Sequence, residues 1–372
     1  MLTLAMAYRL FIILSFLAIF VSGINYKTIV FSILFSLLAT SFGLMEILKR
    51  KRRLNFPKHF GLMVMFVIIL NLYPIFIKDK INPIYFAAIF GEGLLYWLIF
   101  FNIKNGGNLF RSLLIKLTLL YSLFYVLTRF SNLNLTTFSA YFFQEGLPSK
   151  HYHIGDLWAF TLTLIVGLGW GKFKLKDWLI MDLGILFLVI SNARSAYLSL
   201  LLGFAYIATK RWGKAKINRY LPIIFFFSTI GLFMFASSSK TTLFSRPYFL
   251  QSITSFPTHP LGVGFGNFKL INEYILKTTL AKEVSLSSYV HNIFLEALSG
   301  VGIFSVLFLI FLIQVAKDLW QASSEKVVWG ALLTAILINF MFDTTYTIPS
   351  LIWILFICLG VFQASKSQPK ET

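Results

Sequence analysis

Charged residues are scarce in this sequence, and acidic residues are the scarcest. Asp, Glu, Lys and Arg make up 13% of the 372 residues, against roughly 25% in soluble domains. The single cysteine, Cys358, excludes an internal disulfide and leaves the redox compartment open. No cleavage pattern of small residues follows the first apolar run, so we interpret that run as a retained span. The composition excludes an ordinary soluble domain.

Apolar residues are correspondingly abundant. Hydrophobic residues make up 58% of the chain and aromatic residues 18%, and the mean hydropathy is +0.78. A net charge of +19 would suit a nucleic-acid partner, but the Lys and Arg residues lie in short segments between apolar runs. This is the pattern of cytoplasmic loops in membrane proteins. The sequence predicts an all-α integral membrane protein, a single polytopic domain over residues 1–372, with no nucleic-acid partner.

About twelve runs approach the length of about 20 apolar residues that a spanning helix needs. They are residues 8–24, 27–48, 59–77, 81–102, 110–130, 153–171, 177–193, 195–210, 219–237, 291–316, 325–343 and 347–364. The seventh and eighth runs are divided at residues 191–195, because together they are too long for one crossing.

Basic residues alternate between rich and poor loops along these runs, which sets the predicted orientation. Both termini are expected in the cytoplasm. Arg194, Asp343 and a long loop over residues 238–290, between the ninth and tenth spans, are expected on the opposite face. The basic cluster at residues 49–53 is interpreted as an orientation signal in contact with anionic membrane lipids.

Polar chemistry is concentrated in one stretch, residues 245–302. It contains Arg246, His259 and His291, together with a glycine-rich turn at residues 260–268. A mostly apolar protein with one such loop is expected to carry its active site there.

Arg194 and Arg246 are the candidate anion ligands. Neither has an acidic neighbour in the sequence, and a guanidinium group offers a rigid fork of donors that suits phosphate oxygens. Two arginines on one face would suit a diphosphate. Alternatively, Arg194 is an interfacial arginine whose side chain reaches the lipid headgroups, and Arg246 is an ordinary loop arginine.

His291 stands where the long loop re-enters the membrane. A histidine with a near-neutral pKa accepts a proton from a hydroxyl nucleophile, although a lone interfacial histidine is structural about as often. The serines at 285, 287 and 288 are candidate helix caps. Glu296 is given a supporting role only. Asp343 is a candidate partner for an arginine or for the acceptor.

Two other motifs are weaker. The glycines at 262, 264 and 266 have G-x-G-x-G spacing with no following Lys-Ser/Thr, so they fail as a nucleotide-binding motif and indicate a tight loop. His151, His153 and Asp156 contain zinc-type ligands, but no further ligand lies nearby in the sequence. We expect no metal and no cofactor.

The polar stretch resembles the signature of the O-antigen ligase and polymerase superfamily of bacterial inner membranes. The resemblance is carried by Arg246, by the turn HPLGVGFGNF from His259, and by the segment HNIFLEALSGVG from His291. The segment SNARSA at 191–196 is similar to a further family motif, with Asn192 where a small hydroxyl residue is common.

The resemblance implies a metal-independent glycosyltransferase in the bacterial inner membrane, with its active site facing the periplasm. The donor would be a glycan on undecaprenyl diphosphate, and the acceptor in ligases is a sugar hydroxyl of the lipid A–core oligosaccharide. Arg194 and Arg246 would bind the donor diphosphate and His291 would act near the acceptor. His259, Gly264, Asn292 and Asp343 would join the arginines in substrate binding.

Four alternatives remain at this point. A repeat-unit polymerase of the same superfamily would use a lipid-linked acceptor, and a glycan-to-protein transferase would use a protein. A transporter of a lipid-linked glycan would need buried charges in its spans, for which Glu92, Lys116 and Asp182 are the candidates. A structural membrane partner would not depend on Arg246 or His291.

Overall fold

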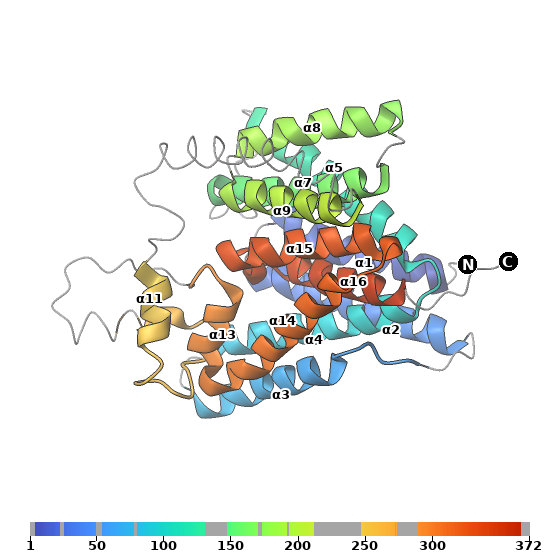
Figure 1. Cartoon of the computed structure of the whole chain (residues 1–372). Helices are drawn as coiled ribbons and strands as arrows, with labels where there is room; N and C mark the ends of the chain where they lie inside the picture. The colour runs from blue at the N-terminus through green and yellow to red at the C-terminus, as the bar shows by residue number, and fades with distance from the viewer. Residues whose placement is uncertain are drawn as a thin grey trace.

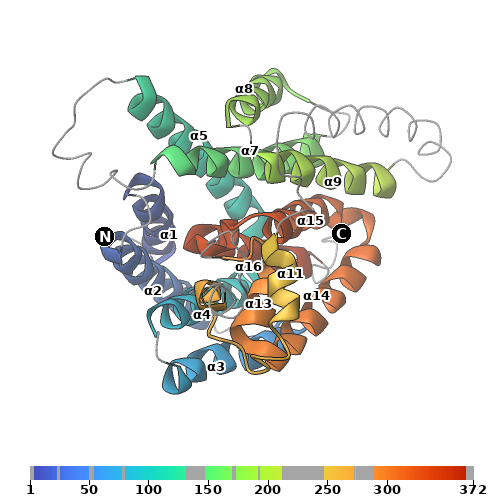
Figure 2. The same ribbon diagram turned by 90° about the vertical axis from the view of Figure 1, so that its left-hand side faces the viewer.

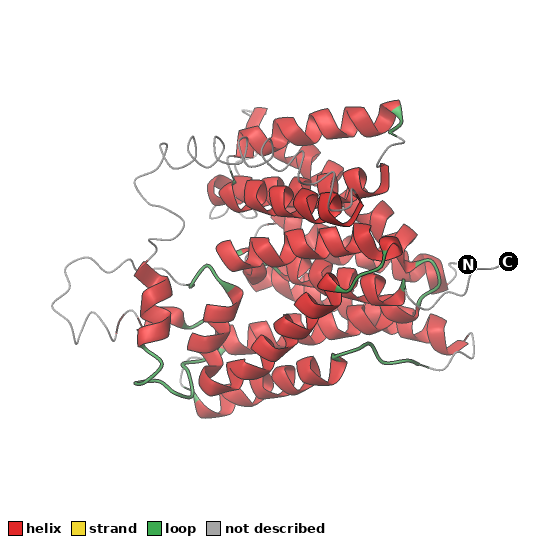
Figure 3. Ribbon diagram, viewed as in Figure 1, coloured by secondary structure: helices red, strands yellow, loops and turns green. Residues whose placement is uncertain are grey.

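The computed structural model describes residues 4–22, 26–49, 54–77, 80–130, 147–169, 173–191, 193–211, 247–271, 273 and 289–365. Over these residues the protein consists of helices and loops, with no strand (Figure 3). The helices run side by side as a bundle (Figure 1). The described part of the chain is therefore all-α, as the composition predicts.

Apart from a short helix at Pro247–Thr254, inside the loop expected over residues 238–290, the helices follow the apolar runs of the sequence. They are α1 (Leu4–Ser22), α2 (Tyr26–Lys49), α3 (Phe60–Phe76), α4 (Ile81–Asn102), α5 (Gly106–Phe130), α7 (Leu147–Gly169), α8 (Leu175–Ser191), α9 (Arg194–Arg211), α11 (Pro247–Thr254), α13 (Ile293–Val301), α14 (Ser305–Trp320), α15 (Val327–Phe342) and α16 (Pro349–Ala364), with short 3-10 turns η1 (Gly302–Phe304), η2 (Ser324–Lys326) and η3 (Thr345–Thr347). The ninth predicted span, 219–237, lies outside the described residues.

Two boundaries test the sequence analysis closely. The division of the seventh and eighth runs is confirmed, because α8 ends at Ser191 and α9 begins at Arg194. The tenth run matches one apolar stretch, Ile293–Trp320, but its α-helix is interrupted, because α13 ends at Val301 and α14 begins at Ser305. The reason is Gly302, whose φ of 56° is incompatible with a continuing α-helix.

Among the described residues, four stretches are long and apolar enough to cross a membrane: Val30–Lys49, Ile81–Asn102, Ile293–Trp320 and Ser324–Phe342. Four shorter apolar helices accompany them, at Met6–Ser15, Phe60–Phe76, His153–Gly169 and Pro349–Ala364. The outer surface is also apolar, as on α8, where Leu175, Leu179 and Val189 are exposed. Apolar side chains exposed in this way suit contact with lipid. These features are those of a helical membrane protein.

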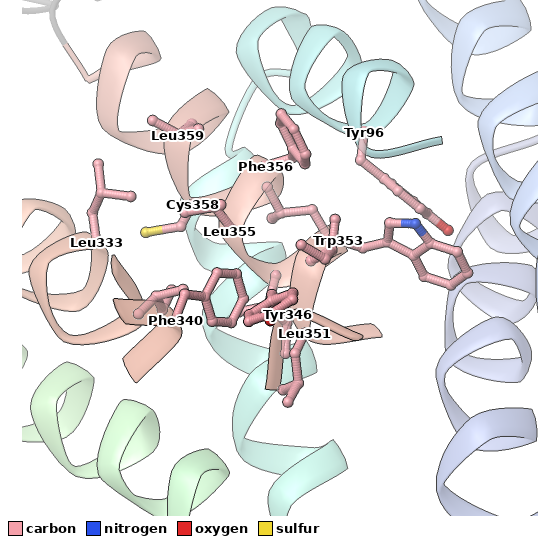
Figure 4. Close-up of a cluster of buried hydrophobic side chains, with 14 of the residues drawn as sticks. Tyr96, Leu333, Phe340, Tyr346, Leu351, Trp353, Leu355, Phe356, Cys358 and Leu359 are labelled. Carbon is pink, nitrogen blue, oxygen red and sulfur yellow. The ribbon is translucent and has the colours of Figure 1, made fainter. Parts of the chain in front are cut away.

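Helix α16 is the centre of the bundle. Its residues from Pro349 to Gln363 are buried, and it packs along α4, where the Trp353 indole N–H donates to the carbonyl of Ile89 at 3.1 Å. The ring of Trp353 also lies against that of Tyr96, with centroids 5.6 Å apart. Figure 4 shows this aromatic and aliphatic cluster, with Tyr346 and Phe340 at the edge nearest the end of α15. A core of this density holds the ends of α15 and α16 in fixed positions.

One end of the bundle carries the segments from the polar stretch. Helices α11 and α13 lie together at that end (Figure 1), which faces the viewer in Figure 2. The hydroxyl of Ser252 on α11 donates to the carbonyl of Leu295 on α13 at 2.8 Å. The described part of the polar stretch is therefore folded onto the bundle.

Candidate functional site

Arg194 is the first residue of α9 and is partly buried. The next residue, Ser195, is buried, and its hydroxyl donates to Oδ2 of Asp343 at 2.7 Å. Asp343 directly follows the last residue of α15. Asp343, expected as a partner of an arginine or of the acceptor, thus contacts the residue that follows Arg194 in the chain.

A second carboxylate lies beside the same serine. Asp156 on α7 is fully buried, and its Oδ1 lies 3.3 Å from the Ser195 hydroxyl oxygen. Oδ1 also accepts from the side-chain amide of Asn339 at 2.6 Å, and the amide oxygen of Asn339 accepts from Thr345. Helices α7, α9 and α15 therefore meet in one buried polar cluster, defined by Asp156, Ser195, Asn339 and Asp343.

The start of α13 approaches the same end of α15. Asn292 caps α13 by accepting from the backbone N–H of Leu295 at 2.9 Å, and its amide donates to the carbonyl of Met341 at 3.0 Å. The cap is thus Asn292, a type that ranks among the best N-caps. The serines expected as caps, at 285, 287 and 288, lie outside the described residues.

His291 directly precedes this cap and has a φ of 60°. Few residues other than glycine adopt this left-handed conformation, although histidine is among those enriched there. The residues on either side of it are held by tertiary contacts, because the N–H of Val290 donates to Glu296 and the amide of Asn292 donates to the carbonyl of Met341. The tertiary structure therefore fixes the backbone at His291.

Glu296 joins the two halves of the polar stretch. Its fully buried carboxylate accepts from the N–H of Gly266 at 3.0 Å, the N–H of Val290 at 2.9 Å and the hydroxyl of Tyr346 at 3.0 Å. Burial raises the pKa of Tyr346 well above its usual value, and the charge of Glu296 raises it further. The tyrosine is therefore a donor at ordinary pH, and all three partners donate to Glu296. We call Glu296, Gly266, Val290 and Tyr346 the Glu296 clasp.

The glycine-rich turn satisfies backbone groups at the end of α13. The N–H of Val263 donates to the carbonyl of Ser299 at 2.9 Å, and the N–H of Gly264 to the carbonyl of Gly300 at 2.7 Å. In return, the N–H of Ile303 donates to the carbonyl of Pro260 at 2.9 Å. The first two bonds satisfy carbonyls at the helix end that have no donor within the helix. The N–H groups of Val263 and Gly264 are thus unavailable to a phosphate, in agreement with the rejection of a nucleotide motif.

Substituting Gly302 with alanine is expected to destabilise the protein. A Cβ at this position would lie 2.0 Å from the carbonyl oxygen of Pro260, and the φ of 56° disfavours any side chain. We expect a loss of several degrees in the melting temperature of the detergent-solubilised protein. Gly91→Ala on α4 is the matched control, because its Cβ would meet nothing within 4 Å and alanine favours a helix. Equal melting temperatures for the two variants would contradict the close contact.

The structure brings some of the predicted site residues together. Arg194 and Asp343 are joined through Ser195, and Asn292 and Gly264 lie in the segments around α13. His259 is more peripheral, on the outer turn, where its Nδ1 lies 2.9 Å from the Thr258 hydroxyl. Arg246 lies outside the described residues, immediately before α11.

Sequence reasoning missed the connecting residues. It considered Asp156 only as a metal ligand, gave Glu296 a minor role and did not consider Asn339. The signal that identifies them is a polar side chain within an apolar run, which is costly in a membrane unless it is partnered. Among the described residues, no three His, Cys, Asp or Glu side chains form a group able to hold a metal ion.

Comparisons with known proteins add no family to this description. The chain matches no protein-family model, and no curated protein is similar to it at a significant level. The site is therefore interpreted from its own geometry and from the motif resemblance in the sequence.

Proposed function

We propose that this protein is an O-antigen-ligase-type glycosyltransferase of the bacterial inner membrane. It transfers a glycan from undecaprenyl diphosphate to a sugar hydroxyl of the lipid A–core oligosaccharide, on the periplasmic face and without a metal ion. The proposal combines the motif resemblance with the arrangement of the described residues.

The observation that carries it is the meeting of two motif segments at the end of α15. Ser195, next to Arg194, bonds to Asp343, while Asn292, next to His291, bonds to the carbonyl of Met341. Arg194 and His291 are far apart in the sequence, yet their neighbours are held by residues two apart. An anion ligand and a proton acceptor are thus supported on one rigid frame, as a transferase site needs.

The chemistry follows from these groups. The acceptor oxygen attacks the anomeric carbon, the bond from that carbon to the diphosphate oxygen breaks, and its electron pair leaves with the diphosphate. Arg194 and Arg246 stabilise the charge on this leaving group, as preorganised cations do. His291 accepts the proton of the attacking hydroxyl. The lipid diphosphate is itself an activated donor, so the reaction requires no nucleotide.

The test uses purified protein in detergent with undecaprenyl-diphosphate-linked glycan as donor and lipid A–core as acceptor. A ladder of glycan on lipid A–core supports the ligase. Longer lipid-linked chains without attachment to the core would make the protein a polymerase of the same superfamily. No product with either acceptor would contradict the proposal and favour a transporter or a structural partner.

Substituting Arg194 with alanine is expected to lower glycan transfer roughly 10- to 100-fold, the usual effect of losing a charged hydrogen bond. The transfer rate of Arg194→Lys is expected to lie between those of the wild type and Arg194→Ala, because an ammonium group cannot form a bidentate contact with phosphate. Arg9→Ala, at an exposed arginine of α1, is the matched control and should transfer normally. Wild-type rates for Arg194→Ala at equal membrane levels would contradict the role of Arg194.

A further inference from the structure

One atom of the buried polar cluster, on Asp156, and one atom of its helical neighbour His153 are left out of the hydrogen bonds. Oδ2 of Asp156 and Nδ1 of His153 are both buried without a hydrogen-bond partner, and they lie 3.7 Å from each other on one turn of α7. A buried polar atom left without a partner is costly, and proteins retain few of them. A proton bound to either atom would turn their contact into a favourable interaction.

A count of protons on the other side of Asp156 points the same way. Ser195 has a single hydroxyl proton, which it donates to Asp343 at 2.7 Å, yet its oxygen also lies 3.3 Å from Oδ1 of Asp156. Two carboxylates thus face one hydroxyl. When both are ionised they repel each other, and one additional proton relieves the repulsion.

We propose that His153 and Asp156 form a proton-binding site that sets the charge beneath Arg194 and thereby couples donor binding to proton uptake. The inference rests on the proposed function, since it takes the diphosphate of the donor as the ligand of Arg194. With the proton bound, the cluster carries one negative charge fewer next to Arg194. The anionic donor therefore binds more tightly to the protonated form.

The groups that face Asp156 from neighbouring elements are few among the described residues. His153 lies on the same helix as Asp156, and the neutral Tyr121 of α5 lies near enough to Asp156 to interact with it electrostatically. Helix α9 contributes Ser195 and the adjoining Arg194, and the end of α15 contributes Asp343. On α8, Ser191 bonds to its own helix and Asp182 is exposed. The coupling is therefore assigned to His153 and Asp156.

The direction of the effect follows from linkage. A ligand that prefers the protonated form takes up protons as it binds, and loses affinity as rising pH removes them. We expect the dissociation constant of a short polyprenyl diphosphate to rise about tenfold from acidic to alkaline pH, a coupling of ordinary size. Calorimetry of this binding, in buffers of different ionisation enthalpy, measures the proton uptake directly.

Asp156→Asn is the decisive variant. The asparagine is isosteric, so its oxygen still accepts from Asn339 and its amide donates to Nδ1 of His153 without a titrating proton. We expect tight binding that varies less with pH and takes up fewer protons than in the wild type. His153→Gln should also reduce the uptake, and Asp182→Asn should leave it unchanged. Purified wild-type enzyme should show the same trend in KM for the donor, separately from kcat.

The outcomes separate the two proposals. Binding of the diphosphate with equal proton uptake in wild type, Asp156→Asn and His153→Gln would overturn the proton-binding site and leave the transferase assignment standing. Binding by the wild type with no uptake would do the same. Failure of the wild type to bind the diphosphate at any pH would overturn the proposed function and the inference with it.

Discussion

Replacing His291 with asparagine is expected to lower glycan transfer by a factor of about 10² to 10⁴, the usual contribution of a general base. Asparagine is chosen over alanine because His291 has a φ of 60°, and asparagine adopts the left-handed region more readily than alanine. The variant therefore removes the imidazole with little additional backbone strain. Transfer to lipid A–core by purified protein measures the effect.

The chain offers a closely matched control. His59 also has a left-handed φ, 61°, and its ring contacts Asp318 at 3.3 Å, away from the candidate site. His59→Asn makes the same substitution in the same backbone conformation and should retain wild-type transfer. Equal rates for the two variants would remove His291 from the mechanism. Equal losses at reduced protein levels would assign the effect to folding.

Replacing Glu296 with alanine is expected to cost about 3 kcal/mol or more in the free energy of unfolding. Two buried N–H groups and one hydroxyl lose their acceptor, and each buried donor left unsatisfied costs about 1–3 kcal/mol. The loss of stability in Glu296→Gln should be smaller than in Glu296→Ala, because only one acceptor oxygen is replaced, by an amide nitrogen that faces a donor. The melting temperature in detergent measures the effect.

The control is Glu325→Ala, at an exposed residue of the turn η2. Its melting temperature should equal that of the wild type. Transfer should also fall in Glu296→Ala, because the clasp includes Val290, the residue before His291. A stable Glu296→Ala protein with normal transfer would contradict the structural role of the clasp.

The longer helices were predictable because hydrophobic run length determines them directly, whereas the short α11 inside the polar stretch was not predicted. The break between α8 and α9 could be predicted because a single helix there would be too long for a bilayer. The interruption of the helix at Gly302 was not predicted, because a glycine inside an apolar run looks the same whether the helix continues or ends. The conformation at Gly302 depends on the tertiary structure, because the next residue, Ile303, donates to the Pro260 carbonyl, which a side chain at Gly302 would strike.

The site was predictable in its residue types more than in its partners. Arg194, His291 and Asp343 are polar residues at the ends of apolar runs, and such positions stand out in the sequence. The pairing of Asp343 with Asp156 through Ser195 joins three helices, and no spacing rule indicates it. Glu296 lies five residues after His291, and helical spacing alone gave it little weight. Its importance arises from the backbone of the loop, whose path the sequence does not reveal.

The Glu296 clasp also bears on how freely this protein can diversify. The backbones of Gly266 and Val290 end on the same carboxylate, and Phe268 and Ile271 between them are buried in one cluster with Val290. A change of length next to the clasp would displace these packed side chains, whereas the entropy of closing a longer loop grows only slowly with length. Sequence change between Gly266 and Val290 is thus limited by the packing at the clasp rather than by the number of residues.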